Sequence, residues 1–491
     1  MFVGILGEEW EEKEKSSIFS DFNLNLFVSK ADSLSRGVHL QPLFLHIPER
    51  VETVKYRRAI TSDFQNQRIY TAFENYSAQV EKAKGYEKMS EENNNQSESD
   101  KWHADALYLF AQAVMGLHQE MTETAGYSPA MKELVEYLRQ YIEDEKFQAW
   151  KKLTEEIHNE IDEQAVSFYI QKNKVALAQE QETKDFLQRM AEAFSLTEKE
   201  EARLEIGDGK LTLFERVMAE RLIKGKKLDK KLRQLRAVKL EPKLLAMAYE
   251  VQFYLGFYRF KGYMEKKGYE FVLPKESEHI RVTDGYDAAM ALKDEDREVV
   301  RNDFYMGDGE KFFVITGANG GGKTTFARMA GQILYFSQMG LMVPCKSAEL
   351  PYFSGILSHF SNEESEETGK GKLMEELIRL RPMMKASCSN CFVVLNELFT
   401  TAATADAGIM GKKVLEHFMG NNCRGIYVTH IQSLAEESEG IVSMVAELEK
   451  DHHTRSFKIV RKPAAEGEYE DSLITEYCMT YEQIKKVIEN K

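Results

Sequence analysis

The chain has 491 residues, 43% of them hydrophobic and 30% charged, and its 65 Lys and Arg residues against 80 Asp and Glu give a net charge of −15. This length predicts two or three domains, and the acidic balance disfavours indiscriminate binding to nucleic acid. No apolar run approaches the ~18 residues of a membrane-spanning helix. The five cysteines occur without a secretory signal, which favours a cytoplasmic protein with no membrane partner.

Residues 1–100 are expected to form an N-terminal region that is mostly helical after residue 50. Short apolar runs interrupted by Pro42 and Pro48 indicate extended segments before that point, and helix-like periodicity begins near Val51. The polar run Ser90–Asp100 has no apolar anchors and therefore predicts an exposed loop.

Residues 101–269 are expected to form a second, helical region. Apolar residues recur at i, i+3 and i+4 from Trp102 to about Ile161, which predicts long antiparallel helices. Two β-type runs around Lys172 and Asn173 predict a small hairpin. The basic segment Arg221–Lys243 is a candidate contact for the phosphate backbone of DNA. The alternative is a solvated basic face that pairs with acidic neighbours.

Residues 270–491 are expected to form an α/β domain, because short β runs alternate there with helices. The stretch "GANGGGKTT" follows the strand-like "KFFVIT" and precedes a helix-forming run, which is the context of a Walker A loop. Its glycines let backbone N–H groups surround phosphate oxygens, while Lys323 reaches the β- and γ-phosphates of ATP and the Thr324 hydroxyl binds Mg²⁺. The predicted nucleotide-binding residues here are Gly317, Ala318, Asn319, Gly320, Gly321, Gly322, Lys323, Thr324 and Thr325.

The run "CFVVLNEL" predicts a buried parallel strand that ends at Asn396, where an acidic pair is expected to orient Mg²⁺ and activate water. Asn396 keeps a carbonyl oxygen for the metal but lacks the charge, and such changes typically cost ~10–100-fold in affinity or activity. Glu397 is the predicted general base. A third strand, "GIYVTHI", places His430 to sense the γ-phosphate. Glu397, His430 and Lys323 are thus the catalytic candidates.

The order of these motifs resembles the ATPase domain of the MutS family of DNA mismatch-repair proteins. The matching residues outside the loop are Asn302, Asp303, Gln338, Gly340, Val343, Pro344, Glu397, Thr404 and Asp406, whereas Asn396, Phe399 and Thr400 depart from the pattern. The resemblance implies an α + α/β fold, in which a helical core and lever region precedes a P-loop ABC-type ATPase domain with a mostly parallel sheet. It also implies that Asn302 belongs to the nucleotide site and Gln338 to the metal site.

The family closes two ATP sites across a dimer with a signature loop in trans. The aligned segment "GKGKLMEEL" makes Lys372 a candidate to face the γ-phosphate of a partner in a homodimer. The Asn-Glu pair and "ETVKYRRAI" resemble a divergent bacterial branch, and the family's mismatch-reading Phe-x-Glu motif does not occur in the sequence. Two functions stay open. One is a slow ATPase whose dimer closure binds DNA in repair or recombination; the other is an ATP-gated switch or scaffold that binds a protein.

Overall fold

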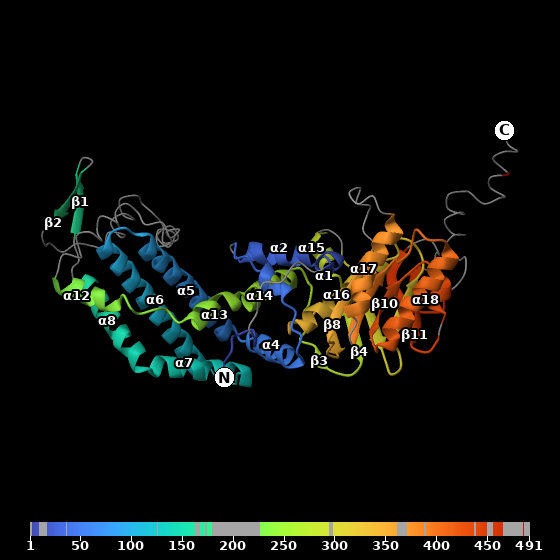
Figure 1. Cartoon of the computed structure of the whole chain (residues 1–491), viewed down its shortest axis with the longest axis horizontal. Helices are drawn as coiled ribbons and strands as arrows, with labels where there is room; N and C mark the ends of the chain where they lie inside the picture. The colour runs from blue at the N-terminus through green and yellow to red at the C-terminus, as the bar shows by residue number, and fades with distance from the viewer. Residues whose placement is uncertain are drawn as a thin grey trace. The chain divides into compact units, whose positions relative to one another are not determined.

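The computed structural model (Figure 1) describes residues 2–8, 17–35, 37–124, 126–162, 167–171, 174–178, 226–293, 298–360, 371–386, 389–436, 438–448, 455–464 and 485. The chain forms two compact units, which we call the helical unit (Met1–Gly4 and Gln65–Val251) and the α/β unit (Ile5–Phe64 and Gln252–Lys491). The described elements confirm the expected combination of a helical part with an α/β part. No helix in these ranges is long and apolar enough to cross a membrane.

The helical unit consists of long helices and one small hairpin. Its elements are α5 (Gln67–Glu92), α6 (Gln96–Glu123), α7 (Pro129–Glu143), α8 (Glu145–Asp162), β1 (Ser167–Gln171), β2 (Lys174–Ala178), α12 (Lys226–Leu235) and α13 (Pro242–Glu250). The strands β1 and β2 pair antiparallel around residues 172 and 173, which confirms the predicted hairpin. The long helices α6, α7 and α8 confirm the helical periodicity that begins at Trp102.

The prediction of an exposed loop over Ser90–Asp100 is wrong, because α5 continues to Glu92 and α6 begins at Gln96. The Asn95 side chain caps α6 by accepting a hydrogen bond from the N–H of Ser97. The hydroxyl groups of Ser90 and Ser99 each donate to the other residue's backbone carbonyl, at 2.8 Å. The polar side chains therefore stabilise a tight junction between two helices.

The central sheet of the α/β unit has the strand order β12-β11-β6-β10-β9-β8. Its strands are β6 (Phe312–Thr316), β8 (Gly355–Phe360), β9 (Cys391–Asn396), β10 (Arg424–Val428), β11 (Ile441–Leu448) and β12 (Arg455–Arg461). Every neighbouring pair is parallel except β11 with β12, which confirms the predicted mostly parallel sheet. A smaller sheet has the order β3-β7-β4-β5 and contains β3 (Lys275–Glu276), β4 (Ile280–Gly285), β5 (Asn302–Met306) and β7 (Ser347–Leu350).

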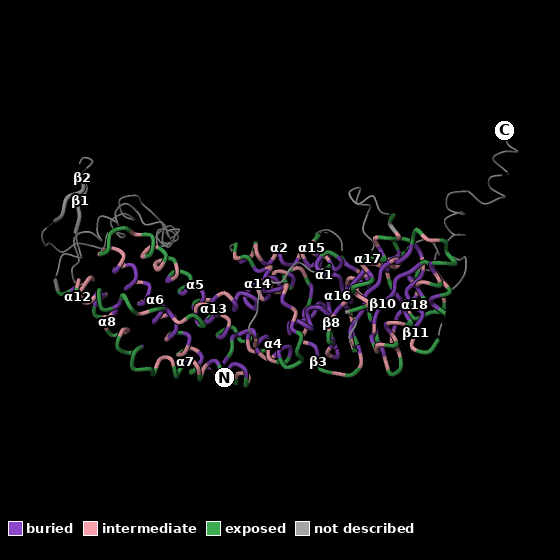
Figure 2. Tube along the Cα trace, viewed as in Figure 1, coloured by how far each residue is buried: buried purple, intermediate pink, exposed green. Residues whose placement is uncertain are grey.

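Helices cover both faces of the central sheet. They include α16 (Lys323–Gln338), α17 (Lys372–Ala386), α18 (Thr404–Gly420) and the short η1 (Gln432–Ala435), whereas α15 (Ala288–Lys293) contacts the helix α2 (Leu24–Leu34). On one face, Val314 and Leu395 form a core cluster with Leu380 of α17 and Phe418 of α18. Side chains alternate between faces along a strand, so Phe313 points to the opposite face, where α16 lies against β9 and β10. Buried residues accordingly follow the strands (Figure 2).

The described residues 17–63 are mostly helical, so the prediction of extended segments around Pro42 is wrong there. They form α1 (Ser17–Asp21), α2 (Leu24–Leu34), α3 (Gln41–Leu45) and α4 (Val51–Asp63). Phe27 of α2 meets the rings of Phe44, Phe260 and Phe336 edge-on at centroid distances of 4.7–5.0 Å. Such packing contacts stabilise short helices, which would be unstable in isolation.

The borders of the two compact units do not coincide with the domain limits that we expected after residues 100 and 269. Residues 5–64 belong to the α/β unit because they bond to the carboxyl end of α16 and the turn after it. The Thr61 hydroxyl donates to the carbonyl of Gly340 at 2.7 Å, and Arg58 donates to the Ser337 hydroxyl at 3.3 Å. The next helix of this unit is α14 (Gln252–Lys266), which contacts α2.

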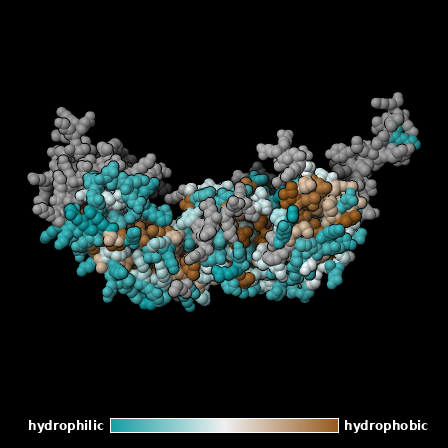
Figure 3. All heavy atoms as spheres, in the orientation of Figure 1, coloured by the Kyte–Doolittle hydropathy of each residue, from teal (hydrophilic) through white to brown (hydrophobic). Residues whose placement is uncertain are grey.

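The outer side of α17 and α18 exposes four large apolar side chains, which we call the α17–α18 apolar patch. Their exposed fractions are Met374 54%, Leu377 40%, Ile378 49% and Ile409 59%. The three residues of α17 lie at i, i+3 and i+4 and therefore share one face of the helix. Figure 3 shows hydrophobic side chains gathered on the surface in this part of the α/β unit.

Candidate nucleotide site

A glycine-rich loop joins the buried strand β6 to the N-terminus of α16. Gly317, Gly320 and Gly322 have φ angles of +111°, +70° and +93°, which residues with a side chain rarely adopt. Gly322 is the N-cap of α16 and supplies no side chain to satisfy the first N–H groups of the helix. These donors and the helix dipole therefore make the loop a site for an anion such as a phosphate.

Lys323, the first residue of α16, is a buried cation beneath this loop, with an exposed fraction of 4%. Its ammonium group donates hydrogen bonds to the carbonyl oxygens of Gly317 at 2.8 Å and Ala318 at 2.9 Å. Burial lowers the pKa of Lys323, and the nearby carboxylate of Glu397 opposes that shift. Because no ion pair to Lys323 occurs among the described residues, an anion bound in the loop would stabilise its charge.

Asn396 ends strand β9 beside the start of α16. The Thr324 hydroxyl donates a hydrogen bond to the side-chain carbonyl oxygen of Asn396, at 3.1 Å. Asn396 is paired in register with Val428 of β10 and Phe360 of β8, so its backbone is fixed by neighbours on both sides. Two oxygen atoms of the kind that Mg²⁺ prefers thus lie together at the carboxyl ends of parallel strands, where α/β folds bind their ligands.

Glu397 and His430 form a pair next to these oxygen atoms. The Nε2 atom of His430 lies 3.1 Å from the Glu397 carboxylate, and the two side chains are 43% and 29% exposed, respectively. The backbone N–H of Glu397 donates to the Val428 carbonyl at 2.9 Å, although its φ angle of +55° is unusual for a residue with a side chain. The carboxylate is therefore held at the edge of the cavity, accessible to water.

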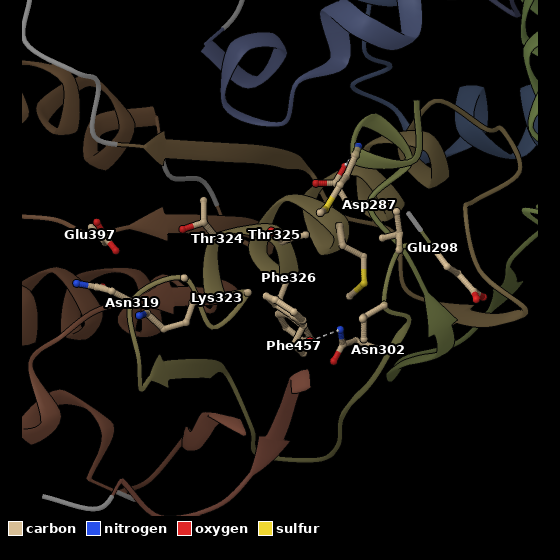
Figure 4. Close-up of a pocket in the computed structure, with 16 residues that line it drawn as sticks. Asp287, Glu298, Asn302, Asn319, Lys323, Thr324, Thr325, Phe326, Glu397 and Phe457 are labelled. Carbon is tan, nitrogen blue, oxygen red and sulfur yellow. Dashed lines mark hydrogen bonds between the residues drawn. The ribbon is translucent and has the colours of Figure 1, made fainter. Parts of the chain in front are cut away.

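A cavity of about 190 Å³ is lined by Lys323, Thr324 and Glu397, whereas Asn396 and His430 lie outside its lining. Figure 4 shows Glu397 and Asn319 toward one end, Glu298 at the other, and Phe326 and Phe457 between them. Eight of the lining residues were not predicted from the sequence: Asp287, Met290, Glu298, Val299, Val300, Phe326, Met329 and Phe457. Three of them lie next to predicted residues in the sequence, because Val299 and Val300 precede Asn302 and Phe326 follows Thr325.

Asn302 lines the cavity, but its side-chain amide is bonded to β12. It donates to the Phe457 carbonyl at 3.1 Å and accepts from the N–H of Ile459 at 2.9 Å. Phe457, whose φ angle is +57°, is thereby fixed with its side chain in the cavity wall. Asn302 thus shapes the predicted nucleotide site through β12.

Gln338 and Lys372, two further residues predicted for the site, are not among the residues that line the cavity. Gln338 is the last residue of α16, about 22 Å along the helix from the loop at 1.5 Å per residue. Its buried amide donates to the Phe353 carbonyl at 2.8 Å. The prediction that Gln338 belongs to the metal site is therefore wrong. Lys372 begins α17, and its side chain lies outside the described residues.

Three side chains in the described part of the basic segment Arg221–Lys243 pair with acidic residues: Lys231, Arg233 and Arg236. Lys231 bridges Glu156 and Glu160, and Arg236 donates to Asp100 at 2.7 Å. These contacts correspond to the alternative of a basic face with acidic neighbours. Within the described part of the chain, no ion pair is recorded for the exposed Lys227 and Lys230.

A family model described as MutS domain V matches residues 313–476, from β6 past the end of β12. The chain therefore carries a segment that matches MutS domain V, and over this segment it is similar to MutS-family proteins. The glycine-rich loop, Asn396, Glu397 and His430 all lie within this MutS domain V. Asn302 precedes it, so the cavity also uses residues from outside the matched segment.

Curated relatives align over the same part of the chain. The DNA mismatch repair protein MutS of Fervidobacterium nodosum is 31% identical over 145 residues, which are 29% of this chain and 18% of that protein. The DNA mismatch repair protein MSH2 of Saccharomyces cerevisiae is 29% identical over 164 residues, 32% of this chain and 17% of that protein. MutS of Thermotoga maritima is 30% identical over 137 residues, which are 28% of this chain and 17% of that protein. The chain thus spans less than a fifth of the length of these relatives.

Proposed function

We propose that the chain binds ATP with Mg²⁺ in its MutS domain V and hydrolyses it slowly. The observation that carries this proposal is the contact between Thr324 and Asn396 at 3.1 Å, directly after the buried Lys323 at the loop. It places the glycine-rich loop and two oxygen atoms of the kind that Mg²⁺ prefers at one edge of the sheet, which supports the proposal. The Glu397–His430 pair adds a carboxylate that can accept a proton from water.

Each residue has a role that follows from its position. The loop N–H groups and Lys323 would bind the phosphates, with the ammonium exchanging its carbonyl partners for phosphate oxygens. Thr324 and Asn396 would hold Mg²⁺, which supplies positive charge at the phosphates when it is bound. Glu397 would orient and deprotonate the attacking water, and His430 would hold the Glu397 side chain in place. Slow turnover follows from the neutral side chain of Asn396.

ATP titration of the wild-type chain and of Lys323→Ala tests the binding step. We expect saturable binding by the wild type and a loss of at least about 10-fold in affinity for the variant, because a charge-assisted contact to phosphate is removed. Lys311→Ala is the matched control, since Lys311 donates to the Met419 carbonyl and is not among the residues that line the cavity. Equal affinity of the wild type and Lys323→Ala would contradict the proposed site.

We propose further that ATP drives closure of a cytoplasmic homodimer that binds DNA in repair or recombination. The curated relatives described above are DNA mismatch repair proteins by name, and two observations support the proposal in this chain. The α17–α18 apolar patch offers a surface that a second copy could bury. Lys227 and Lys230 are exposed cations on α12 that are suited to phosphate contacts.

A second candidate function is an ATP-gated switch or scaffold that binds a protein partner. The acidic pairing of Lys231 and Arg236 favours it, because those side chains are already neutralised. Binding of plain, mismatched and branched DNA, with and without ATP, separates the two candidates. If the protein binds DNA, the logarithm of its DNA-binding constant falls linearly with the logarithm of the salt concentration. This slope should be shallower in the double variant Lys227→Ala/Lys230→Ala. Absence of DNA binding at ~50 mM salt, where phosphate contacts are strongest, would leave the protein-binding candidate.

A further inference from the structure

Glu376 of α17 is buried against the turn that follows Glu397. Its exposed fraction is 4%, and that of Phe399 is 1%. One carboxylate oxygen of Glu376 accepts a hydrogen bond from the backbone N–H of Phe399, at 2.9 Å. A contact between a carboxylate and an N–H group in a buried setting is stronger than an ordinary hydrogen bond. It joins α17 to the segment that carries the proposed general base.

The backbone of this turn adopts an unusual conformation. Glu397 and Phe399 have φ angles of +55° and +62°, and neither is a glycine. Left-handed residues with side chains persist only where the surroundings hold them. Here the N–H of Glu397 is held by the Val428 carbonyl of β10, and that of Phe399 by Glu376. The two ends of the turn are thus fixed by two different elements.

Glu376 itself does not line the nucleotide cavity. Its helix packs on the core cluster through Leu380, and Phe399 and Leu398 belong to the same cluster. The Glu376 carboxylate also helps to raise the pKa of the Tyr427 hydroxyl on β10, after the larger effect of burial. The carboxylate therefore acts inside the protein, beneath the turn, and its hydrogen bond to the Phe399 N–H connects it to the segment that carries Glu397.

We propose that Glu376 is a positioning residue for Glu397. Its carboxylate keeps Phe399 in the left-handed conformation, which in turn directs the Glu397 side chain toward His430 and the phosphate end of the cavity. Without this acceptor, the buried N–H of Phe399 loses its partner and the turn relaxes. This inference rests on the proposed function, because it assigns the position of the general base in ATP hydrolysis.

The test compares Glu376→Ala and Glu376→Gln with the wild type and with Glu375→Ala, a control on the adjacent, half-exposed residue. ATP affinity, the single-turnover hydrolysis rate and the thermal unfolding midpoint are measured for each. Glu376→Ala is expected to hydrolyse ATP roughly 100-fold more slowly, the loss typical of a misplaced catalytic group, with ATP affinity within about 2-fold. Glu376→Gln keeps an oxygen that can accept the Phe399 N–H and is expected to restore most of the rate.

Crystal structures of Glu376→Ala and Glu376→Gln provide a readout that does not depend on turnover. We expect the left-handed turn and the Glu397–His430 contact to persist in Glu376→Gln and to be lost in Glu376→Ala. An unchanged rate or turn in Glu376→Ala, or an equal loss of ATP affinity and rate, would overturn the inference. If the wild type binds ATP but does not hydrolyse it, the proposed function fails, and the two structures alone decide whether Glu376 sets the turn.

Discussion

The Thr324 hydroxyl donates a hydrogen bond to the side-chain oxygen of Asn396, at 3.1 Å. The two residues are 72 positions apart in the sequence, and the contact is the point where the glycine-rich loop meets strand β9. An asparagine there supplies an oxygen but no negative charge. The same geometry therefore explains how the site can accept Mg²⁺ and why it should hold the ion less firmly than a carboxylate would.

The substitution Asn396→Asp is expected to strengthen Mg²⁺ binding and raise the hydrolysis rate. A carboxylate at this position keeps the acceptor for Thr324 and adds a negative charge for the metal. We therefore expect the apparent affinity for Mg²⁺ to increase by ~10-fold or more. The measurement is hydrolysis as a function of Mg²⁺ concentration at saturating ATP. Asn396→Ala, which removes the oxygen, should shift the curve in the opposite direction. Identical Mg²⁺ curves for the three proteins would show that residue 396 does not hold the metal.

Gly320→Ala is expected to weaken ATP binding. A methyl group at this position would lie 2.7 Å from the guanidinium of Arg455, and the φ angle of +70° is strained for alanine by about 1–2 kcal/mol. If the loop must keep this shape to bind phosphate, that strain weakens the affinity for ATP by roughly 5–30-fold. Gly85→Ala is the control, because Gly85 lies in α5 with open space around it and should tolerate alanine. Equal ATP affinity for both variants would mean that the loop does not bind ATP in this conformation.

His103 is expected to make the stability of the helical unit depend on pH. Its ring nitrogens lie 2.7 Å from the Glu87 carboxylate and 3.1 Å from the Leu235 carbonyl, so the protonated ring satisfies two acceptors. Burial opposes the charge, but these bonds raise the pKa of His103 above the ordinary value of a histidine, about 6.5. The stabilisation is therefore fully present below pH 6.5 and is lost as the pH rises through the pKa of the folded state.

Thermal unfolding of the full chain at pH 6 and pH 8.5 measures this effect. We expect the helical unit to unfold at a lower temperature at pH 8.5, and His103→Gln to lose most of that difference. Removing a hydrogen bond to a charged group typically costs about 1.5–3 kcal/mol, so the variant should also be less stable than the wild type at pH 6. A pH dependence that is the same in the wild type and His103→Gln would assign it to other groups.

The elements that the sequence predicted best are those with a strong local signal. The loop before Lys323, the buried run that ends at Asn396 and the hairpin around Lys172 each combine an apolar pattern with a specific turn. Their local contacts confirm the elements themselves. The parallel sheet then explains why the ends of β6, β9 and β10 meet, although the chain separates them widely.

The elements that the sequence did not predict depend on contacts with distant residues. The short helices before residue 50 are stabilised by packing on α14 and α16, as the edge-on contacts of Phe27 show. Gln338 matched a motif, but a motif does not give the direction of a side chain, and its amide is used by the Phe353 backbone. The left-handed Phe399 and its bond to Glu376 likewise have no local signal, because the acceptor comes from another helix.

Single-turnover hydrolysis of ATP by the wild type and Glu397→Gln tests the central claim most directly. Glutamine keeps the size of the side chain but cannot accept the proton from water. We therefore predict unchanged ATP binding and hydrolysis that is detectable in the wild type and abolished in the variant. A Glu397→Gln protein that hydrolyses ATP as fast as the wild type would contradict the assignment of Glu397 and with it the proposed site.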